Sequence, residues 1–178
     1  EDIEEKNPKL FDGGTTLLHF TANNGHHNIC KKIIENISDK NPLDKDTWTP
    51  LHCAAQNGHL KVCEYILKNI EENNPKGLGD ITPLHIAAQN GHFGVCKYIL
   101  KNTTDKDPKD ATGRTPYDLA DYNDHSKICE LIAEERGDKD YQHRSVQVHF
   151  LNRRIQNHLN NFSNLIKSSP MGTCNAVS

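Results

Sequence analysis

Short apolar and polar stretches alternate along the first three quarters of the chain, with the spacing expected of helices. In the stretch LKVCEYILKN (60–69), apolar residues recur three and four positions apart, and charged residues occupy positions between them. The apolar set is Val62, Cys63, Ile66 and Leu67. This spacing predicts an amphipathic helix that buries one face.

A shorter helix is expected just before it. Thr49 followed by Pro50 is typical of a helix start, because a threonine hydroxyl can cap a free backbone amide and proline suits the first helical position. Asn57 and Gly58 indicate that this helix ends after about two turns. The polar stretch IEENNPKGLGD (70–80) contains Pro and Gly, and it predicts a turn and a hairpin after the second helix.

This pattern of helix, turn, helix and hairpin is repeated. TPLHCAAQNGH at 49–59 returns as TPLHIAAQNGH at 82–92. The repeat threonines Thr16, Thr49, Thr82 and Thr115 are each 33 positions apart. The same interval relates Gly25, Gly58 and Gly91, then His26, His59, His92 and His125, and also Cys30, Cys63, Cys96 and Cys129. A fixed period of this length indicates stacked repeats.

The TPLH start, followed by AA and GH at this period, resembles the ankyrin repeat over roughly residues 1–136. The resemblance implies a mainly α fold, an ankyrin-repeat solenoid of stacked antiparallel helix pairs with projecting hairpin loops. It also implies that His19, His52 and His85 hydrogen-bond the neighbouring turn as structural residues. We expect ankyrin repeats over 1–137, as a partial repeat at 1–8 and units near 9–41, 42–74, 75–107 and 108–137, then a C-terminal amphipathic helix at 138–167 and a flexible tail at 168–178.

The chain departs from the family pattern in three places. The glycine usual after the second helix is replaced by Ile37, Ile70 and Thr103, and the asparagine just before each, at 36, 69 and 102, is expected to adopt the left-handed conformation instead. In the fourth unit, Asp118, Asp121 and Asp124 replace a histidine, an alanine and a glycine, which is typical of an end cap. EDIEEKNP (1–8) resembles the joints between units, so a preceding repeat is expected.

Composition favours the same class of fold. With 34% hydrophobic and 6% aromatic residues, the chain is poor in the bulky side chains of a single large core. No apolar run or leader indicates membrane insertion or secretion, so we expect a cytoplasmic or nuclear protein. The net charge is −3, and it is −7 for residues 1–140 because only basic residues follow Asp140. An acidic array argues against nucleic-acid binding, which needs clustered lysine and arginine.

Eleven histidines and six cysteines raise the question of metal binding or catalysis. The pairs His26 with Cys30 and His59 with Cys63 have a spacing that could place two ligands on one helical face. These pairs recur one unit apart, whereas a structural zinc site needs four ligands at one point and a nucleophile needs one singular pocket. We therefore expect no catalytic residues, no metal and no cofactor, and reduced, buried ladder cysteines.

The resemblance implies a non-enzymatic scaffold or adaptor that binds a protein through hairpin tips and the concave first-helix face. The alternative is a regulatory or assembly segment of a larger channel or enzyme. The position before each repeat threonine varies, from Thr15 to Trp48, Ile81 and Arg114, so it carries distinguishing information. The other expected contact residues at the tips are Lys45, Asp46, Leu78 and Thr112, and those on the first helices are Asn23, Asn24, Gln56, Asn57, Gln89, Asn90, Tyr122 and Asn123.

Two expectations leave alternatives open. Trp48, the only tryptophan, is the leading candidate for a binding hot spot, and the alternative is that its ring packs on a neighbouring tip or joint. From Val148 to Ile166, apolar residues recur at helical spacing. This stripe is expected to pack on the last repeat, to mediate self-association or to enter a partner's groove.

Overall fold

A computed structural model of the chain describes residues 7–10 and 13–138, which belong to one compact unit ending at Asp138. Its elements are helices, joined by loops. The expected partial repeat at 1–8 lies mostly outside the described residues, as do the expected C-terminal helix beyond Asp138, its proposed self-association and the tail at 168–178.

Eight α-helices and one 3-10 helix form the described part. They are α1 (Leu17–Asn23), α2 (His27–Ile34), α3 (Pro50–Gln56), α4 (Leu60–Leu67), η2 (Leu78–Asp80), α5 (Pro83–Gln89), α6 (Phe93–Asn102), α7 (Pro116–Tyr122) and α8 (Ser126–Arg136). Each hairpin with the helix pair that follows it is called here a repeat, from repeat 1 (α1, α2) to repeat 4 (α7, α8).

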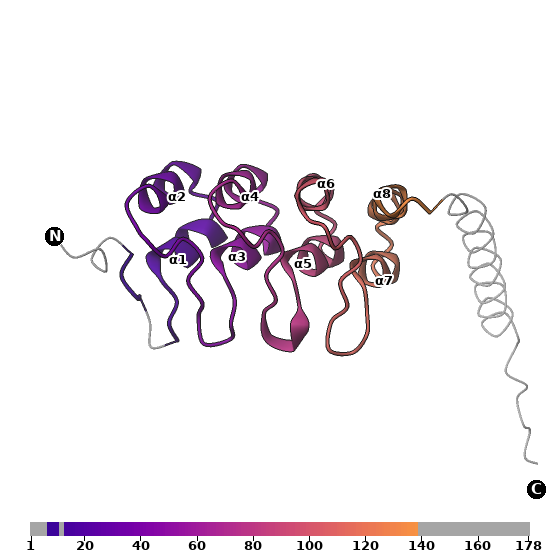
Figure 1. The fold of residues 1–178 in the computed structure, drawn as a ribbon, viewed down its shortest axis with the longest axis horizontal. Helices are drawn as coiled ribbons and strands as arrows, with labels where there is room; N and C mark the ends of the chain where they lie inside the picture. Colours follow the sequence, from indigo (N-terminus) through magenta and orange to yellow (C-terminus); the bar gives the residue numbers. More distant parts are fainter. Residues whose placement is uncertain (1–6, 11–12, 139–178) are drawn as a thin grey trace, which may run out of the picture. The chain divides into compact units, whose positions relative to one another are not determined.

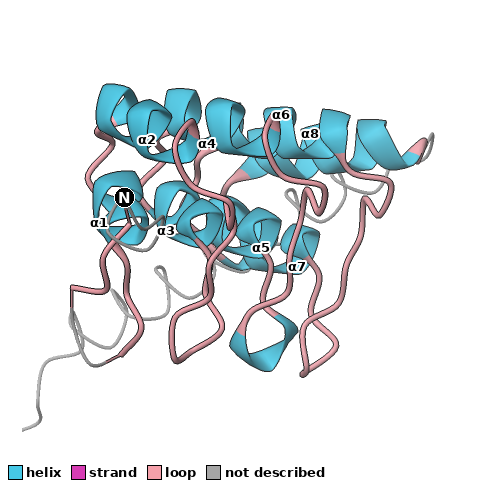
Figure 2. Ribbon diagram, turned by 60° about the vertical axis from the view of Figure 1, so that its left-hand side comes forward, coloured by secondary structure: helices cyan, strands magenta, loops and turns pink. Residues whose placement is uncertain are grey.

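The helices form two layers. The first helices α1, α3, α5 and α7 pack side by side in one layer, and the second helices α2, α4, α6 and α8 pack side by side in the other (Figure 1). The hairpins extend from the first-helix layer, away from the second helices (Figure 2). The helix pairs expected from the sequence pattern are therefore confirmed.

The first helices begin where the Thr-Pro signal predicts. Each repeat threonine is the N-cap, and it forms a capping box with the third residue of its helix, which is histidine in repeats 1 to 3 and Asp118 in repeat 4. Capping satisfies backbone amides that lack a partner within the helix. Such short helices form because they are capped and packed against neighbouring helices, not through intrinsic propensity alone.

The core lies between the two layers. The apolar stripe of α4 is buried, and Leu51, Ile66 and Leu84 are fully enclosed. Burying a side chain of this size stabilises the fold by about 1.5–3 kcal/mol. The four ladder cysteines are also buried on the second helices, as predicted.

The expected left-handed asparagines are wrong. Neither Asn36, Asn69 nor Asn102 has a positive φ. Each instead donates its side-chain amide to the carbonyl four residues earlier, at 2.7 Å in all three cases. The helices α2, α4 and α6 therefore end with an asparagine side chain that satisfies a free carbonyl, whereas α8 ends at Gly137, which has the left-handed conformation.

A second histidine row joins neighbouring repeats. His59, His92 and His125 donate from Nε2 to the carbonyls of Asn23, Gln56 and Gln89, at the end of the first helix in the preceding repeat. The ring lies against the glycine there: a Cβ on Gly58 would come 2.5 Å from Nδ1 of His92. The glycines at 25, 58 and 91 are thus required by a positive φ and by the next repeat's histidine.

Candidate interaction surface

The second, third and fourth hairpins are each closed by a backbone hydrogen bond at the base. The amides of Asp44, Gly77 and Asp110 donate to the carbonyls of Trp48, Ile81 and Arg114, at 3.0, 2.8 and 2.9 Å. The chain reverses between these residues, and Thr47, Gly79, Asp80 and Gly113 have positive φ there. The apices are therefore residues 45–47, 78–80 and 111–113.

Neighbouring hairpins are tied together near their apices. The amide of Lys45 donates to Gly13 at 2.7 Å, Leu78 to Asp46 at 3.1 Å, and Ala111 to Gly79 at 2.8 Å. These bonds join the projecting loops into one row, which Figure 2 shows below the first helices. The row therefore presents its side chains at fixed spacing.

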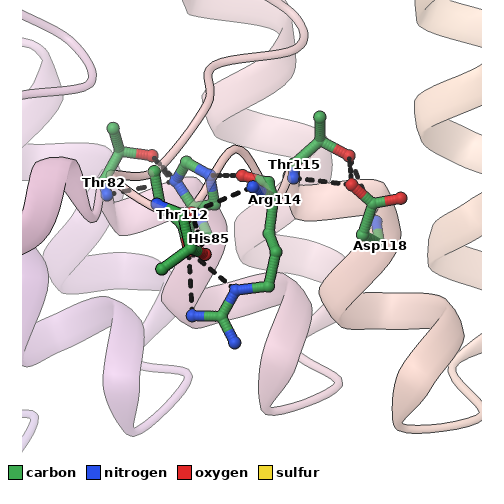
Figure 3. Close-up of polar contacts among 7 residues, drawn as sticks. Thr82, His85, Thr112, Arg114, Thr115 and Asp118 are labelled. Atoms are coloured by element: carbon green, nitrogen blue, oxygen red, sulfur yellow. Dashed lines mark hydrogen bonds and ion pairs between the residues drawn. The ribbon is translucent and has the colours of Figure 1, made fainter.

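The TPLH histidines attach each repeat to the next hairpin. Nε2 of His19, His52 and His85 donates to the carbonyls of Trp48, Ile81 and Arg114, at 2.9, 3.1 and 3.1 Å. In each case Nδ1 accepts from the backbone amide of the repeat threonine. Figure 3 shows this for His85 between Thr82 and Arg114. The structural role implied by the family resemblance is confirmed.

Burial favours the neutral form of these three histidines. It lowers the pKa of His52 to about 4 and also lowers the pKa values of His19 and His85, because a charged ring loses its hydration when it is buried. The hydrogen bonds from Nε2 to the hairpin carbonyls act in the opposite direction and do not outweigh burial.

Repeat 4 uses a different residue at this position. Asp118 accepts from the amide and hydroxyl of Thr115, both at 2.8 Å, so it completes the capping box (Figure 3). A carboxylate has no N–H to donate to a following hairpin. In repeat 4, Asp118 therefore caps its own helix but cannot make the hydrogen bond to a following hairpin that the histidines of repeats 1 to 3 make.

Two aspartates shape the second and fourth hairpins. Asp44 accepts from the amides of Asp46 and Trp48, and Asp110 from those of Thr112 and Arg114, all at 2.9 Å. Burial alone would raise the pKa of Asp110, but hydrogen bonds from Thr112 and Arg114 outweigh it and hold that pKa well below its usual range. The guanidinium of Arg114 also pairs with this carboxylate at 2.9 Å.

The residues just before the repeat threonines do not lie where the sequence predicted. Trp48, Ile81 and Arg114 stand at the base of the returning arm, not at the tip, because their carbonyls accept the closing bond and the histidine bond. Thr15, Trp48 and Ile81 are half-buried, and only Arg114 is exposed. The other predicted contact residues are exposed: Lys45, Asp46, Leu78 and Thr112 on the hairpins, and Asn23, Asn24, Gln56, Asn57, Gln89, Asn90, Tyr122 and Asn123 on the first helices or their ends.

Trp48 packs within the array. Its ring stacks on His52, with ring centroids 5.6 Å apart and planes 27° apart. A Cβ at residue 77 would lie 3.1 Å from Cδ1 of Trp48 and 3.2 Å from Nε2 of His52. Gly77, which stands where the second and fourth hairpins have aspartate, therefore leaves room for this stack.

We expect Trp48→Ala to lower the free energy of unfolding by about 1–2 kcal/mol, because it removes an aromatic stack and half-buried apolar surface. Urea unfolding followed by circular dichroism measures this loss. Tyr122→Ala is the matched control, since that ring is 87% exposed. Equal stability of the Trp48 variant and the parent would contradict a packing role.

The asparagines that end the first helices are already engaged. Nδ2 of Asn24, Asn57, Asn90 and Asn123 donates to the carbonyl four residues earlier. The neighbouring positions Asn23, Gln56, Gln89 and Tyr122 are exposed and form the outward row of this layer. One residue of this outward row is also engaged, because Oδ1 of Asn23 accepts a hydrogen bond from Nδ2 of Asn57 at 2.9 Å.

Two exposed leucines on the hairpins were not among the contact residues expected from the sequence. Leu43 is 57% and Leu10 38% exposed on the outgoing arms of two hairpins. The third and fourth hairpins have Lys76 and Lys109 at this position. Aligning the units on the repeat threonine would have found this change from leucine to lysine.

The ladder cysteines are spread along the second helices, one in each repeat. Within residues 7–10 and 13–138, no group of three or more His, Cys, Asp or Glu side chains is placed to hold a metal ion. Burial raises the pKa values of Cys53, Cys63, Cys96 and Cys129 to about 12 and also raises that of Cys30, so these thiols are poor nucleophiles at neutral pH. In the same part of the chain, no helix has the length and apolarity needed to cross a membrane.

Helix pairs in two layers, projecting hairpins and the threonine–histidine capping box define a class of repeat protein. Comparison with family models matches the chain to ankyrin repeats over residues 1–76 and again over 71–144. The chain belongs to the ankyrin-repeat family. Members of this family are generally protein–protein interaction modules and are typically not catalysts. Comparison with curated proteins gave no match.

Proposed function

We propose that the chain is a non-enzymatic scaffold or adaptor that binds a protein partner through its hairpin row and the outward row of its first helices. The observation that carries this proposal is that backbone hydrogen bonds hold neighbouring hairpins in one row. A surface that is already ordered loses little conformational entropy on binding, so its contacts contribute more of their energy to affinity.

The chemistry of this surface favours a protein over a nucleic acid. Leu78 and Tyr122 are 64% and 87% exposed, at a hairpin apex and on the outward row. Exposed aromatic and apolar side chains are typical anchors of protein interfaces, whereas phosphate binding needs clustered cations. The described cysteines are free thiols, which suits a reducing compartment, so we propose that this activity belongs to the cytosol or nucleus.

Capture from a native lysate followed by affinity measurement tests the proposal. We expect Leu78→Ser and Tyr122→Ala each to weaken partner binding about tenfold or more, with little effect on unfolding because both side chains are exposed. Lys61→Ala and Lys97→Ala, at exposed positions of α4 and α6, are the matched controls. Loss of the partner in the lysine variants, with binding kept in the other two, would place the interface on the second helices instead.

A further inference from the structure

Repeat 1 leaves uncovered two apolar positions that other repeats bury. Ile29 on α2 is 46% exposed, whereas its equivalents Val62, Val95 and Ile128 are 1%, 1% and 2% exposed. Phe20 on α1 is 47% exposed, whereas at the same position Ile86 and Leu119 are 5% and 7% exposed and Cys53 is half-buried. Repeats 2 to 4 each have a preceding repeat packed against them, and that is the neighbour that repeat 1 lacks among the described residues.

A polar position on the same face is also without its usual partner. The rings of His59, His92 and His125 donate to a carbonyl of the preceding repeat. His26 occupies the equivalent place at the start of α2 and is exposed. Within residues 13–138 its ring has no such carbonyl to reach. Phe20, His26 and Ile29 therefore define one face, called here the N-terminal face.

Repeat 4, at the C-terminal end of the array, lacks the residues with which repeats 1 to 3 contact the next repeat. Asp121 is exposed at the position where Ala22, Ala55 and Ala88 are fully buried against the next repeat. Asp124 has φ 60° at the position of the glycines against which the next repeat's histidine packs. A Cβ on those glycines comes within 2.5–2.7 Å of the histidine ring, so the side chain of Asp124 occupies that space. Repeat 4 therefore cannot receive another repeat in the same register.

We propose that the N-terminal face is an inter-repeat interface and that its occupant is a further ankyrin helix pair, stacked in the register that repeats 1 to 4 use. Such a pair supplies the three missing elements: apolar cover for Ile29 and Phe20, a first-helix carbonyl for His26, and a glycine beside the histidine ring. The last repeat of a second copy does not supply them, because Asp124 blocks the ring and Asp118 has no N–H to donate. A further repeat can thus stack on repeat 1 but not on repeat 4.

Extending the chain at each end tests this polarity. In one variant, a copy of residues 42–74 replaces residues 1–7, so that the copy's last asparagine stands in the place of Asn7 before Pro8. Asn7 and Asn74 both accept a hydrogen bond from the next first helix, which fixes the register of the join. In the other variant, a copy of residues 75–107 is inserted after residue 140, which continues the 33-residue period.

We expect the N-terminal extension to unfold in one transition with the melting temperature raised by about 5 °C or more. Gly58→Asp within the copy should remove this gain, because it places the carboxylate beside His26. The C-terminal extension should give no gain until Asp121→Ala and Asp124→Gly are introduced. Ile29→Ser should lower the melting temperature more in the N-terminally extended chain than in the parent chain.

Three results would overturn the proposal. The first is an N-terminal extension that unfolds separately and leaves the original transition unchanged. The second is an equal gain from the C-terminal extension with both aspartates in place. The third is a parent chain that dimerises with concentration and is dispersed by Ile29→Glu, since a second copy would then cover the N-terminal face.

Discussion

Gly58→Ala is expected to lower the free energy of unfolding by about 3 kcal/mol, because two separate costs combine at this residue. Gly58 has φ +70°, where a side chain costs about 1–2 kcal/mol. Its new Cβ would also lie 2.5 Å from Nδ1 of His92. The ring must then move and lose its bond to the Gln56 carbonyl, which costs about 1 kcal/mol or more.

The chain offers a matched control for the backbone cost alone. Gly79 has φ +72°, and no atom lies within 4 Å of where its Cβ would be. Gly79→Ala should therefore lower the free energy of unfolding by only about 1–2 kcal/mol. Chemical unfolding of both variants measures the difference. Equal losses at the two sites would show that the histidine yields without cost and that the contact between repeats is weaker than its geometry indicates.

Acidification from pH 7.5 to pH 5 is expected to remove about 2 kcal/mol of stability through His52 alone. The pKa of His52 is about 4 in the fold, against an ordinary value of 6.5. Each pKa unit of difference corresponds to about 1.4 kcal/mol. His19 and His85 act in the same direction, because burial lowers their pKa values too.

The sign follows from proton binding. Between about pH 6.5 and 4 the unfolded chain protonates these histidines and the folded chain does not, so the unfolded state binds more protons. Stability is therefore fully present above pH 6.5 and falls as the pH falls towards 4.

Urea unfolding at a series of pH values measures this loss. His52→Gln keeps an amide that can donate to the Ile81 carbonyl but does not titrate, so its stability should depend less on pH than that of the parent. A nitrogen NMR spectrum should also show the Nε2–H tautomer of His52 at neutral pH. The same pH slope in parent and variant would mean that His52 is not the group responsible.

The helices could be predicted from the sequence because each has its own local signal, and these signals recur every 33 residues. Thr49 and Pro50 mark a helix start wherever they occur, and the spacing of Val62 and Ile66 identifies a buried face without reference to the rest of the chain. These signals depend on neighbours in sequence. Leu78 and Tyr122, which were expected to contact a partner, are exposed in the structure, and their contact with a partner stays a prediction.

What could not be predicted depends on neighbours in space. The residue before each repeat threonine was expected at the tip, but the closing bond from Asp44 to Trp48 places it at the base. The stack of Trp48 on His52 needs the space above Gly77, 29 positions further along the chain. Asparagine is a residue type that tolerates the left-handed backbone conformation, so the sequence alone favoured that conformation after the second helices. The structure shows instead that the side-chain amide of Asn36 donates to the carbonyl of Lys32.

The forward histidine bonds have a consequence for how such an array can evolve. His19, His52 and His85 donate to main-chain oxygens, which every amino acid carries, and so the bond does not depend on which side chain follows. Positions 48, 81 and 114 hold tryptophan, isoleucine and arginine above the same contact. Substitutions at these positions can therefore change the side chain while the hydrogen bond between repeats is kept. The backbone of each of these residues joins two repeats whatever its side chain is, although the ring of Trp48 also contributes packing.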